Sequence, residues 1–282
     1  MLYVVATPIG NLEDMTPRAI RILNEADIIA AEDTRHSRVL LAFFNIKKTP
    51  IYSCHKFNEG SKGDFFISKL KEGKTIALIS DAGTPCISDP GHLLVNMAAK
   101  AGFPVVAVCG ASAVVAALSV SGFEVNGFQF LGFLPRKKRE IAEILKNALP
   151  NTIVFYESPK RIIETLKIIA ENFEEAQICL CNDITKKFEK SYRGTTHEVI
   201  EELEENPNAE KGEYTCVVSV AKTTSEAIDD ITENTPSLES QLVDIMIKTG
   251  GNLKDAAAEL REKHKLPKRE VYNAMLRLKD LL

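Results

Sequence analysis

Four turns rich in Gly, Pro and charged residues each follow a short apolar run, and these turns are where the sequence could carry chemistry. They read ATPIGN from Ala6, AEDTR from Ala31, SDAGTPCISDPG from Ser80 and ESPKR from Glu157. In open α/β sheets, ligands bind beyond the carboxyl ends of the strands. Gly permits a close approach of the backbone to a ligand, and Pro fixes a turn. A single turn of this kind is usually only a tight bend, but several at corresponding strand ends favour a shared ligand pocket.

The sequence lacks the motifs of the commonest phosphate, hydrolase and metal sites. It contains no GxGxxG and no GxSxG, and its five His residues show no metal-ligand spacing. Gly73-Lys74-Thr75 imitates the end of a phosphate-binding P-loop, but Ser68 stands where that motif requires its first Gly. We therefore expect no metal, and a cofactor held mainly by backbone groups and apolar contacts.

Length and composition are those of an ordinary globular protein. The 282 residues are 45% hydrophobic and 26% charged, with a net charge of −4, so any anion-binding surface must be local. No apolar run reaches the length of a membrane span, and MLYVVATPIG lacks the basic start of a signal peptide. None of the six Cys residues forms a CxxC, and we expect reduced thiols in a cytoplasmic protein.

Alternating strand and helix signals position the first three turns. Short apolar runs separated by helix signals predict an α/β domain with a mainly parallel sheet over residues 1–121. Two of its helices are expected to begin with a capping residue followed by proline, at Thr16-Pro17 and at Asp89-Pro90.

A second α/β domain is expected over residues 122–222. Its strand signals at Gln177–Cys181 and Phe188–Tyr192 have no helix signal between them, which predicts antiparallel pairing within a mixed sheet. Residues 223–236 are polar and acidic and are expected to form a linker. Residues 237–282 carry helix signals throughout and are expected to form a helical tail.

Taken in order, the motifs resemble those of the tetrapyrrole-methylase superfamily. ATPIGNLEDMTPRA, AEDTR, SDAGTPCISDPG, GFLPRK and ESPKR follow one another across about the first 222 residues. They are most similar to the ribosomal branch, the 16S rRNA (cytidine-2′-O)-methyltransferases, whose helix-turn-helix-like C-terminal segment the tail also resembles. The resemblance implies S-adenosylmethionine bound in a cleft between two α/β domains, methylation of a decoding-centre cytidine ribose in the small subunit, and usually a homodimer.

The matching motifs and their charges suggest site residues. For the cofactor these are Pro8, Ile9, Gly10, Asp81, Ala82, Gly83, Pro85, Ile87, Ser112, Ala113, Phe133, Pro135, Ser158 and Pro159. For catalysis they are Asp33, Arg35, Asp183 and Lys186. For RNA they are Arg136, Lys137, Lys138, Arg139, Arg161, Lys268 and Arg269. Each has a plainer interpretation, because Asp33 could cap the helix that begins at Thr34 and the basic residues could lie on a solvated surface.

Two positions depart from the family pattern, and two other functions stay open. Cys109 stands where the family usually has Pro, and Asn182-Asp183 where the branch commonly has Arg-Glu. A precorrin-type tetrapyrrole C-methyltransferase would share the fold and donor but act on a polyanionic macrocycle, which AEDTR and the tail disfavour. A nucleic-acid-binding regulator is the other alternative, because Asp255–Leu278 is compatible with a helix-turn-helix.

Overall fold

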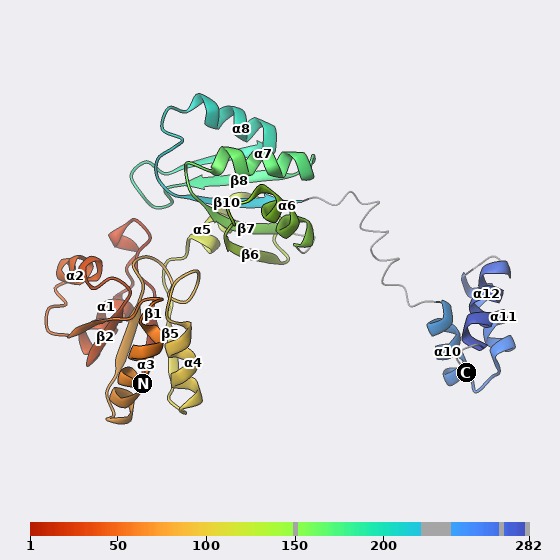
Figure 1. The fold of residues 1–282 in the computed structure, drawn as a ribbon, viewed down its shortest axis with the longest axis horizontal. Coiled ribbons are helices and arrows are strands. Elements are labelled where there is room, and N and C mark those ends of the chain that lie inside the picture. The colour runs from red at the N-terminus through yellow and green to blue at the C-terminus, as the bar shows by residue number, and fades with distance from the viewer. Residues whose placement is uncertain (149–151, 221–237, 265–267, 280–282) are drawn as a thin grey trace. The chain divides into compact units, whose positions relative to one another are not determined.

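The computed structural model describes residues 1–148, 152–220, 238–264 and 268–279. The chain forms two compact units, Met1–Ala221 and Lys222–Leu282. The larger unit contains two five-stranded sheets. Figure 1 shows them with the helices that pack on them. Among the described helices, none combines the length and apolar character that crossing a bilayer requires.

The first sheet, which was predicted to be mainly parallel, is wholly parallel, with the strand order β3-β2-β4-β1-β5. Its elements are β1 Leu2–Val5, η1 Leu12–Asp14, α1 Pro17–Glu25, β2 Ile28–Ala31, α2 Thr34–Phe43, β3 Ile51–Ser53, α3 Glu59–Lys71, β4 Ile76–Ile79, α4 His92–Lys100 and β5 Val105–Val108. No prediction covered η1, β3 or α3, whereas the other strands and helices coincide with the short apolar runs and helix signals from which the domain was predicted.

Helices cover both faces of this sheet. Leu23 of α1 and Ile29 of β2 share a core on one face, while Phe66 of α3 and Ile28 of β2 share a core on the other. Successive residues of a strand point to opposite faces. The uninterrupted apolar runs of β2 and β4 are therefore buried on both sides, as central parallel strands require.

Of the two predicted helix caps, one is confirmed and one is wrong. Thr16 caps α1 with its side-chain oxygen. Asp89 does not cap α4. Instead, the first N–H groups of α4 are capped by buried Glu59 of α3, which lies more than 30 residues earlier in the chain. One carboxylate oxygen of Glu59 accepts the backbone N–H groups of Leu93 and Leu94 at 2.7 and 3.0 Å. Asp89 is thereby available to the site described below.

The second sheet is mixed, with the order β6-β7-β10-β8-β9. Its elements are α5 Ala113–Ser121, β6 Phe128–Phe133, α6 Lys138–Asn147, β7 Thr152–Glu157, α7 Ile162–Asn172, β8 Gln177–Asn182, β9 Lys190–Thr195, α8 Thr196–Glu205 and β10 Tyr214–Ser219. Strands β6 and β7 are parallel, and the other neighbours are antiparallel. The predicted antiparallel pairing of β8 with β9 is confirmed, although β9 begins later than predicted.

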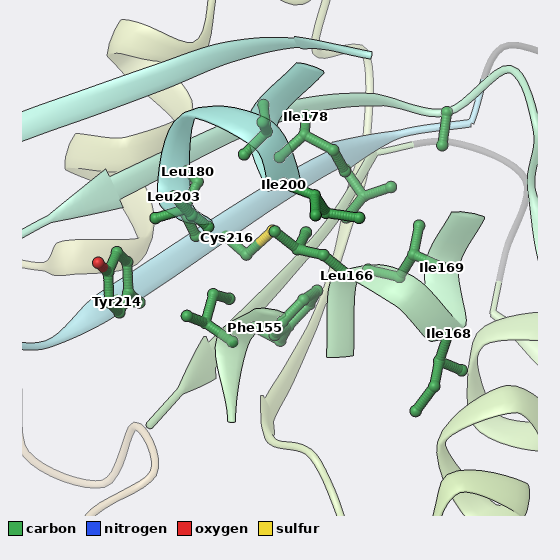
Figure 2. Close-up of a cluster of buried hydrophobic side chains, with 14 of the residues drawn as sticks. Phe155, Leu166, Ile168, Ile169, Ile178, Leu180, Ile200, Leu203, Tyr214 and Cys216 are labelled. Atoms are coloured by element: carbon green, nitrogen blue, oxygen red, sulfur yellow. The ribbon is translucent and has the colours of Figure 1, made fainter. Parts of the chain in front are cut away.

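Helices also cover both faces of the second sheet. On one face, Figure 2 shows Phe155 of β7, Leu166 of α7 and Leu203 of α8 within one buried cluster. On the other face, Val114 of α5 shares a core with Cys179 of β8. Helix α5, which the prediction placed within residues 1–121, therefore packs its apolar side on the second sheet.

The smaller unit contains α10 Leu238–Thr249, α11 Leu253–His264 and α12 Lys268–Lys279. These helices bury a common core that includes Leu242, Leu260 and Ala274. The described part of the tail is thus helical, as predicted, while the predicted linker over residues 223–236 lies outside the described residues.

Candidate functional site

Turns at the ends of both sheets converge on a cavity of about 460 Å³. This volume lies within the range of about 300–1,000 Å³ that is common for small-molecule and cofactor sites. The first sheet contributes the turns after β1, β2, β4 and β5, and the second contributes the last residue of β6 and the turns after β7 and β8. Because β10 runs antiparallel to β7 and β8, its first residues lie beside their last ones and join the wall.

Most residues predicted to hold the cofactor line this cavity. They are Ile9, Asp81, Ala82, Gly83, Ile87, Ser112, Ala113, Phe133, Ser158 and Pro159. The remaining ones, Pro8, Gly10, Pro85 and Pro135, belong to the same turns but are not lining residues.

Sequence reasoning did not single out the other lining residues. They are Glu32, Thr84, Ser88, Asp89, Tyr156, Glu157, Ile184, Glu213, Tyr214 and Thr215. Glu32, Asp89 and Glu157 lie inside the quoted motifs, so a charge count of those motifs could have found them. Tyr214 carried no such signal, because only the insertion of β10 between β7 and β8 brings it to the site.

The wall of the cavity is acidic. It includes the carboxylates of Glu32, Asp81, Asp89, Glu157 and Glu213, and none of the described lining residues is Lys, Arg or His. The carboxylate of Glu157 lies 3.3 Å from the guanidinium of Arg161, and that of Glu213 lies 2.9 Å from the ammonium of Lys186. No ion pair is formed by the other three among the described residues.

Burial and mutual repulsion raise the pKa of two of these carboxylates, Asp89 and Glu32. Burial, together with the charge of Glu32, raises the pKa of Asp89 to about 6, against the opposing effect of a hydrogen bond with Ser80. Burial also raises the pKa of Glu32, although the backbone N–H of Asp81 donates to it at 3.4 Å. Groups perturbed in this way inside a cavity are typical of functional sites. A positively charged ligand would relieve the repulsion.

An aromatic surface forms another part of the wall. Phe133 at the end of β6 is 66% exposed, and its ring centre lies 5.4 Å from that of Tyr156. Burial, with a contribution from the charge of Asp89, raises the pKa of Tyr156 to about 12, so its hydroxyl stays neutral. The cavity therefore offers an aromatic face to a flat ligand close to its carboxylates.

Asp33 and Arg35, predicted to be catalytic, are paired with each other outside the cavity lining. Asp33 caps α2, its carboxylate accepting the backbone N–H of Arg35 at 2.8 Å, and the Arg35 guanidinium lies 2.7 Å from the same group. These hydrogen bonds to Arg35 hold the pKa of Asp33 well below its usual range. The Arg35 side chain is 87% exposed. The geometry favours the helix-cap interpretation of AEDTR for Asp33.

Asp183 and Lys186 form a network with Glu213 beside the cavity. The Lys186 ammonium lies 2.9 Å from the carboxylates of both Asp183 and Glu213. The backbone N–H of Asp183 donates to the Glu213 carbonyl at 2.9 Å, and the Asp183 carboxylate accepts the Glu213 N–H at 3.2 Å. Asp183 and Lys186 thus hold a lining residue in place without lining the cavity themselves.

The basic run Arg136–Arg139 is exposed, and its last two residues begin α6. Two of its lysines pair with glutamates, at 2.8 and 3.0 Å, in exposed ion pairs that are weak in water. Lys268 and Arg269 begin α12, and their side chains lie outside the described part of the chain.

Arg161 has a structural role that the prediction of phosphate binding missed. Its guanidinium pairs with buried Glu157 and donates to the carbonyl oxygens of Leu134 and Pro135. Both terminal nitrogens of Arg161 are bonded to these partners, and only 28% of the side chain is exposed, so the guanidinium is held within the protein.

Comparison with known proteins decides the family. Residues 1–200 match the family described as Tetrapyrrole (Corrin/Porphyrin) Methylases. The chain belongs to this family. Its membership confirms the resemblance drawn from the motifs and the predicted fold class.

Two relatives of this methylase are each named Ribosomal RNA small subunit methyltransferase I. The one from Halalkalibacterium halodurans is 42% identical over 274 residues, which cover 96% of this chain and 93% of the relative. The one from Synechocystis sp. is 40% identical over 281 residues, which cover 99% and 98%. A solved uroporphyrin-III C-methyltransferase from Thermus thermophilus, complexed with S-adenosyl homocysteine, aligns with a TM-score of 0.52 at 16% identity. That alignment covers 77% of this chain and 96% of the solved one, and it shows the common fold.

Proposed function

We propose that this methylase transfers a methyl group from S-adenosylmethionine to the ribose 2′-hydroxyl of a cytidine in 16S rRNA of the small ribosomal subunit. The choice of substrate is supported by similarity along nearly the whole chain to relatives named Ribosomal RNA small subunit methyltransferase I. The similarity extends over the helical tail as well as both sheets, so it covers more than the fold shared with other methylases.

The chemistry of the cavity suits this donor. When bound, S-adenosylmethionine supplies a methyl group on a sulfonium cation, already activated for displacement by an oxygen nucleophile. Glu32, Asp81 and Asp89 would face its positive charge, while Phe133 and Tyr156 would offer a surface to its adenine ring. The small residues Ser112 and Ala113 leave room beside them.

The chain's own contribution is to position the reacting groups and to receive a proton. Since the methyl group is already activated, holding the ribose hydroxyl at attack distance supplies most of the rate acceleration. The proton released by the hydroxyl can pass to a carboxylate of the wall. Asp89 suits this role because a pKa of about 6 lies near the operating pH of a general base.

The acidic wall argues against a tetrapyrrole substrate. A precorrin-type macrocycle carries several carboxylates. It would meet the carboxylates of Glu32, Asp81 and Asp89, which form no ion pair among the described residues, and no Lys, Arg or His among the described lining residues. Like charges at close range in a partly buried site repel strongly. Ribosomal RNA avoids this repulsion, because its phosphates can be held on the exposed basic run while a single sugar enters the cavity.

A homodimer in the cytoplasm is the assembly that we propose. The exposed apolar side chains of Val39 and Phe43, one turn apart on α2, support a contact with a second copy. The cytoplasmic location is supported by the proposed substrate, because small ribosomal subunits are cytoplasmic particles. Sedimentation equilibrium at micromolar concentration checks the assembly, and a mass of 31.1 kDa, that of a single chain, would contradict it.

Methylation of small-subunit particles with a labelled donor tests the function. We expect label in one cytidine of 16S rRNA, located by mapping of the alkali-resistant 2′-O-methyl position. Label in a tetrapyrrole and none in RNA would support the C-methyltransferase alternative. Particle binding without any binding of donor in calorimetry would support the regulator alternative.

A further inference from the structure

Arg161 joins two neighbouring turns of the second sheet. Its two terminal nitrogens each donate to the Leu134 carbonyl at 3.4 Å, and Nη2 also donates to the Pro135 carbonyl. The same Nη2 lies 3.3 Å from Oε2 of Glu157. One guanidinium therefore connects the turn after β6 to the end of β7, its parallel neighbour.

The Glu157 end of this connection belongs to the cavity wall. Glu157 is 2% exposed, and its carboxylate also accepts the backbone N–H of Ser158 at 2.7 Å and the Thr165 hydroxyl at 2.9 Å. Both of its oxygens are thereby occupied. Glu157, Ser158 and Pro159 all line the cavity, so Arg161 is tied to a rigid part of that wall.

The two carbonyl groups that accept from Arg161 lie directly before the basic run in the chain. Leu134 and Pro135 directly precede Arg136–Arg139, the exposed run that leads into α6. A planar guanidinium can satisfy a carboxylate and two carbonyls at once because its donors are fixed in a fork, whereas an ammonium on a flexible stem cannot.

We infer that Arg161 is a positioning residue, which holds the basic run and the RNA bound to it at a fixed place relative to the cofactor cavity. The inference rests on the proposed function, since it takes ribosomal RNA as the ligand of the basic run. Arg161 acts through the carbonyls of Leu134 and Pro135 and contacts neither the donor nor the RNA.

The test is a double-variant cycle in the full-length protein. Arg161→Lys keeps the charge beside Glu157 but loses the fork. We expect it to raise KM for small-subunit particles about fivefold or more, to flatten the salt dependence of particle binding in a filter assay, and to leave donor affinity within twofold. Replacing Arg136–Arg139 by alanine in the Arg161→Lys background should then add little, because the displaced run has already lost its phosphate contacts.

Lys167→Gln is the matched control. Lys167 lies on α7, the helix that begins directly after Arg161, and its ammonium pairs with exposed Glu204 of α8 at 2.7 Å. In the Lys167→Gln background, replacing Arg136–Arg139 by alanine should still have its full effect on KM and on the salt dependence of particle binding. Thermal unfolding verifies the fold, and Arg161→Gln, which keeps two N–H donors without the charge, replaces Arg161→Lys if the latter does not fold.

The inference would be overturned if the Arg161 substitution and the replacement of Arg136–Arg139 had additive effects on KM. It would also be overturned if the Arg161 variant had an unchanged KM and an unchanged salt slope. A failure of the proposed function has a different signature, namely a wild-type protein that methylates no small-subunit RNA. In that event the filter assay can still compare the salt dependence of particle binding between wild type and the Arg161 variant. The assay therefore tests the positioning role separately from the methylation.

Discussion

Thr7 and Gly83 exchange both of their backbone hydrogen bonds. The Thr7 N–H donates to the Gly83 carbonyl at 2.9 Å, and the Gly83 N–H donates to the Thr7 carbonyl at 3.0 Å. This bridge ties the SDAGTP turn to the turn after β1, and it places Gly83 at a φ of +75°. Gly83 therefore shapes the cavity through its conformation, because its own N–H and C=O are already paired and do not face a ligand.

Gly83→Val should abolish donor binding. A side chain at this φ is strained, and a Cβ there would lie 3.2 Å from Cγ2 of Ile9, another lining residue. We expect a loss of stability of about 1–3 kcal/mol together with at least a tenfold loss of donor affinity in calorimetry. Unaltered donor affinity would remove this turn from the cofactor site.

Gly73→Val is the control for strain alone. Gly73 has a similar φ of +81°, but a Cβ there would meet nothing within 4 Å. We expect a comparable loss of stability in thermal unfolding with donor affinity retained. If both variants lost donor affinity equally, general destabilisation would explain the effect at Gly83.

Donor affinity should depend on the ionisation of Asp89. A cation binds more tightly to ionised carboxylates, so affinity for S-adenosylmethionine should rise as the pH increases through about 6. Asp89→Asn should weaken donor binding about three- to tenfold at pH 8 and flatten this rise. Calorimetry between pH 5 and pH 8 measures donor affinity and its pH dependence in wild type and variant. As a control, the affinity of wild type for S-adenosylhomocysteine, which lacks the sulfonium charge, should change little over the same pH range.

The same substitution should stabilise the protein at high pH. The folded state takes up a proton at Asp89 near pH 6, whereas the unfolded chain does so only near the ordinary value of 3.8. The cost of the carboxylate to folding is therefore fully present above about pH 6 and disappears as the pH falls below 4. Asp89→Asn should be more stable than wild type by on the order of 1 kcal/mol at pH 8, after allowance for solvent screening. Equal melting temperatures at pH 8 would contradict the raised pKa.

The local motifs predicted the turns of the site, while long-range packing decided which side chains reach the cavity. Strand β4 and the cap Thr16 were predictable because an apolar run and a local hydrogen bond define them. Helix α3 was not, because Gly60 and Gly63 weaken its helical signal and its stability comes from burying Phe66 and other side chains against the first sheet. Tyr214 was missed for a similar reason, since strand order rather than sequence order brings it to the wall.

The structure changes the expected behaviour of the AEDTR motif. The sequence suggested that Asp33 assists deprotonation, in which case Asp33→Asn would lower kcat. In the structure Asp33 caps α2, and Asn caps a helix about as well as Asp. We therefore expect Asp33→Asn to keep kcat within about threefold and Asp33→Ala to lower the melting temperature through loss of the cap. A large fall in kcat for Asp33→Asn, with donor affinity unchanged, would restore a catalytic role.

The basic run should set the affinity for RNA. Arg136–Arg139 is exposed, and basic residues at a helix N-terminus oppose the helix dipole, so helix stability does not account for them. Replacing all four by alanine should raise KM for small-subunit particles at least tenfold and reduce the slope of log affinity against log salt by up to about 3, because up to four phosphate contacts are lost. Donor affinity should not change. A variant with Lys47, Lys48, Lys71 and Lys100 replaced by alanine makes the same change in net charge on exposed sites of the first sheet's helices and loops. If that control moved KM and the salt slope equally, the effect would be one of overall charge, and the RNA would have to be held by another surface.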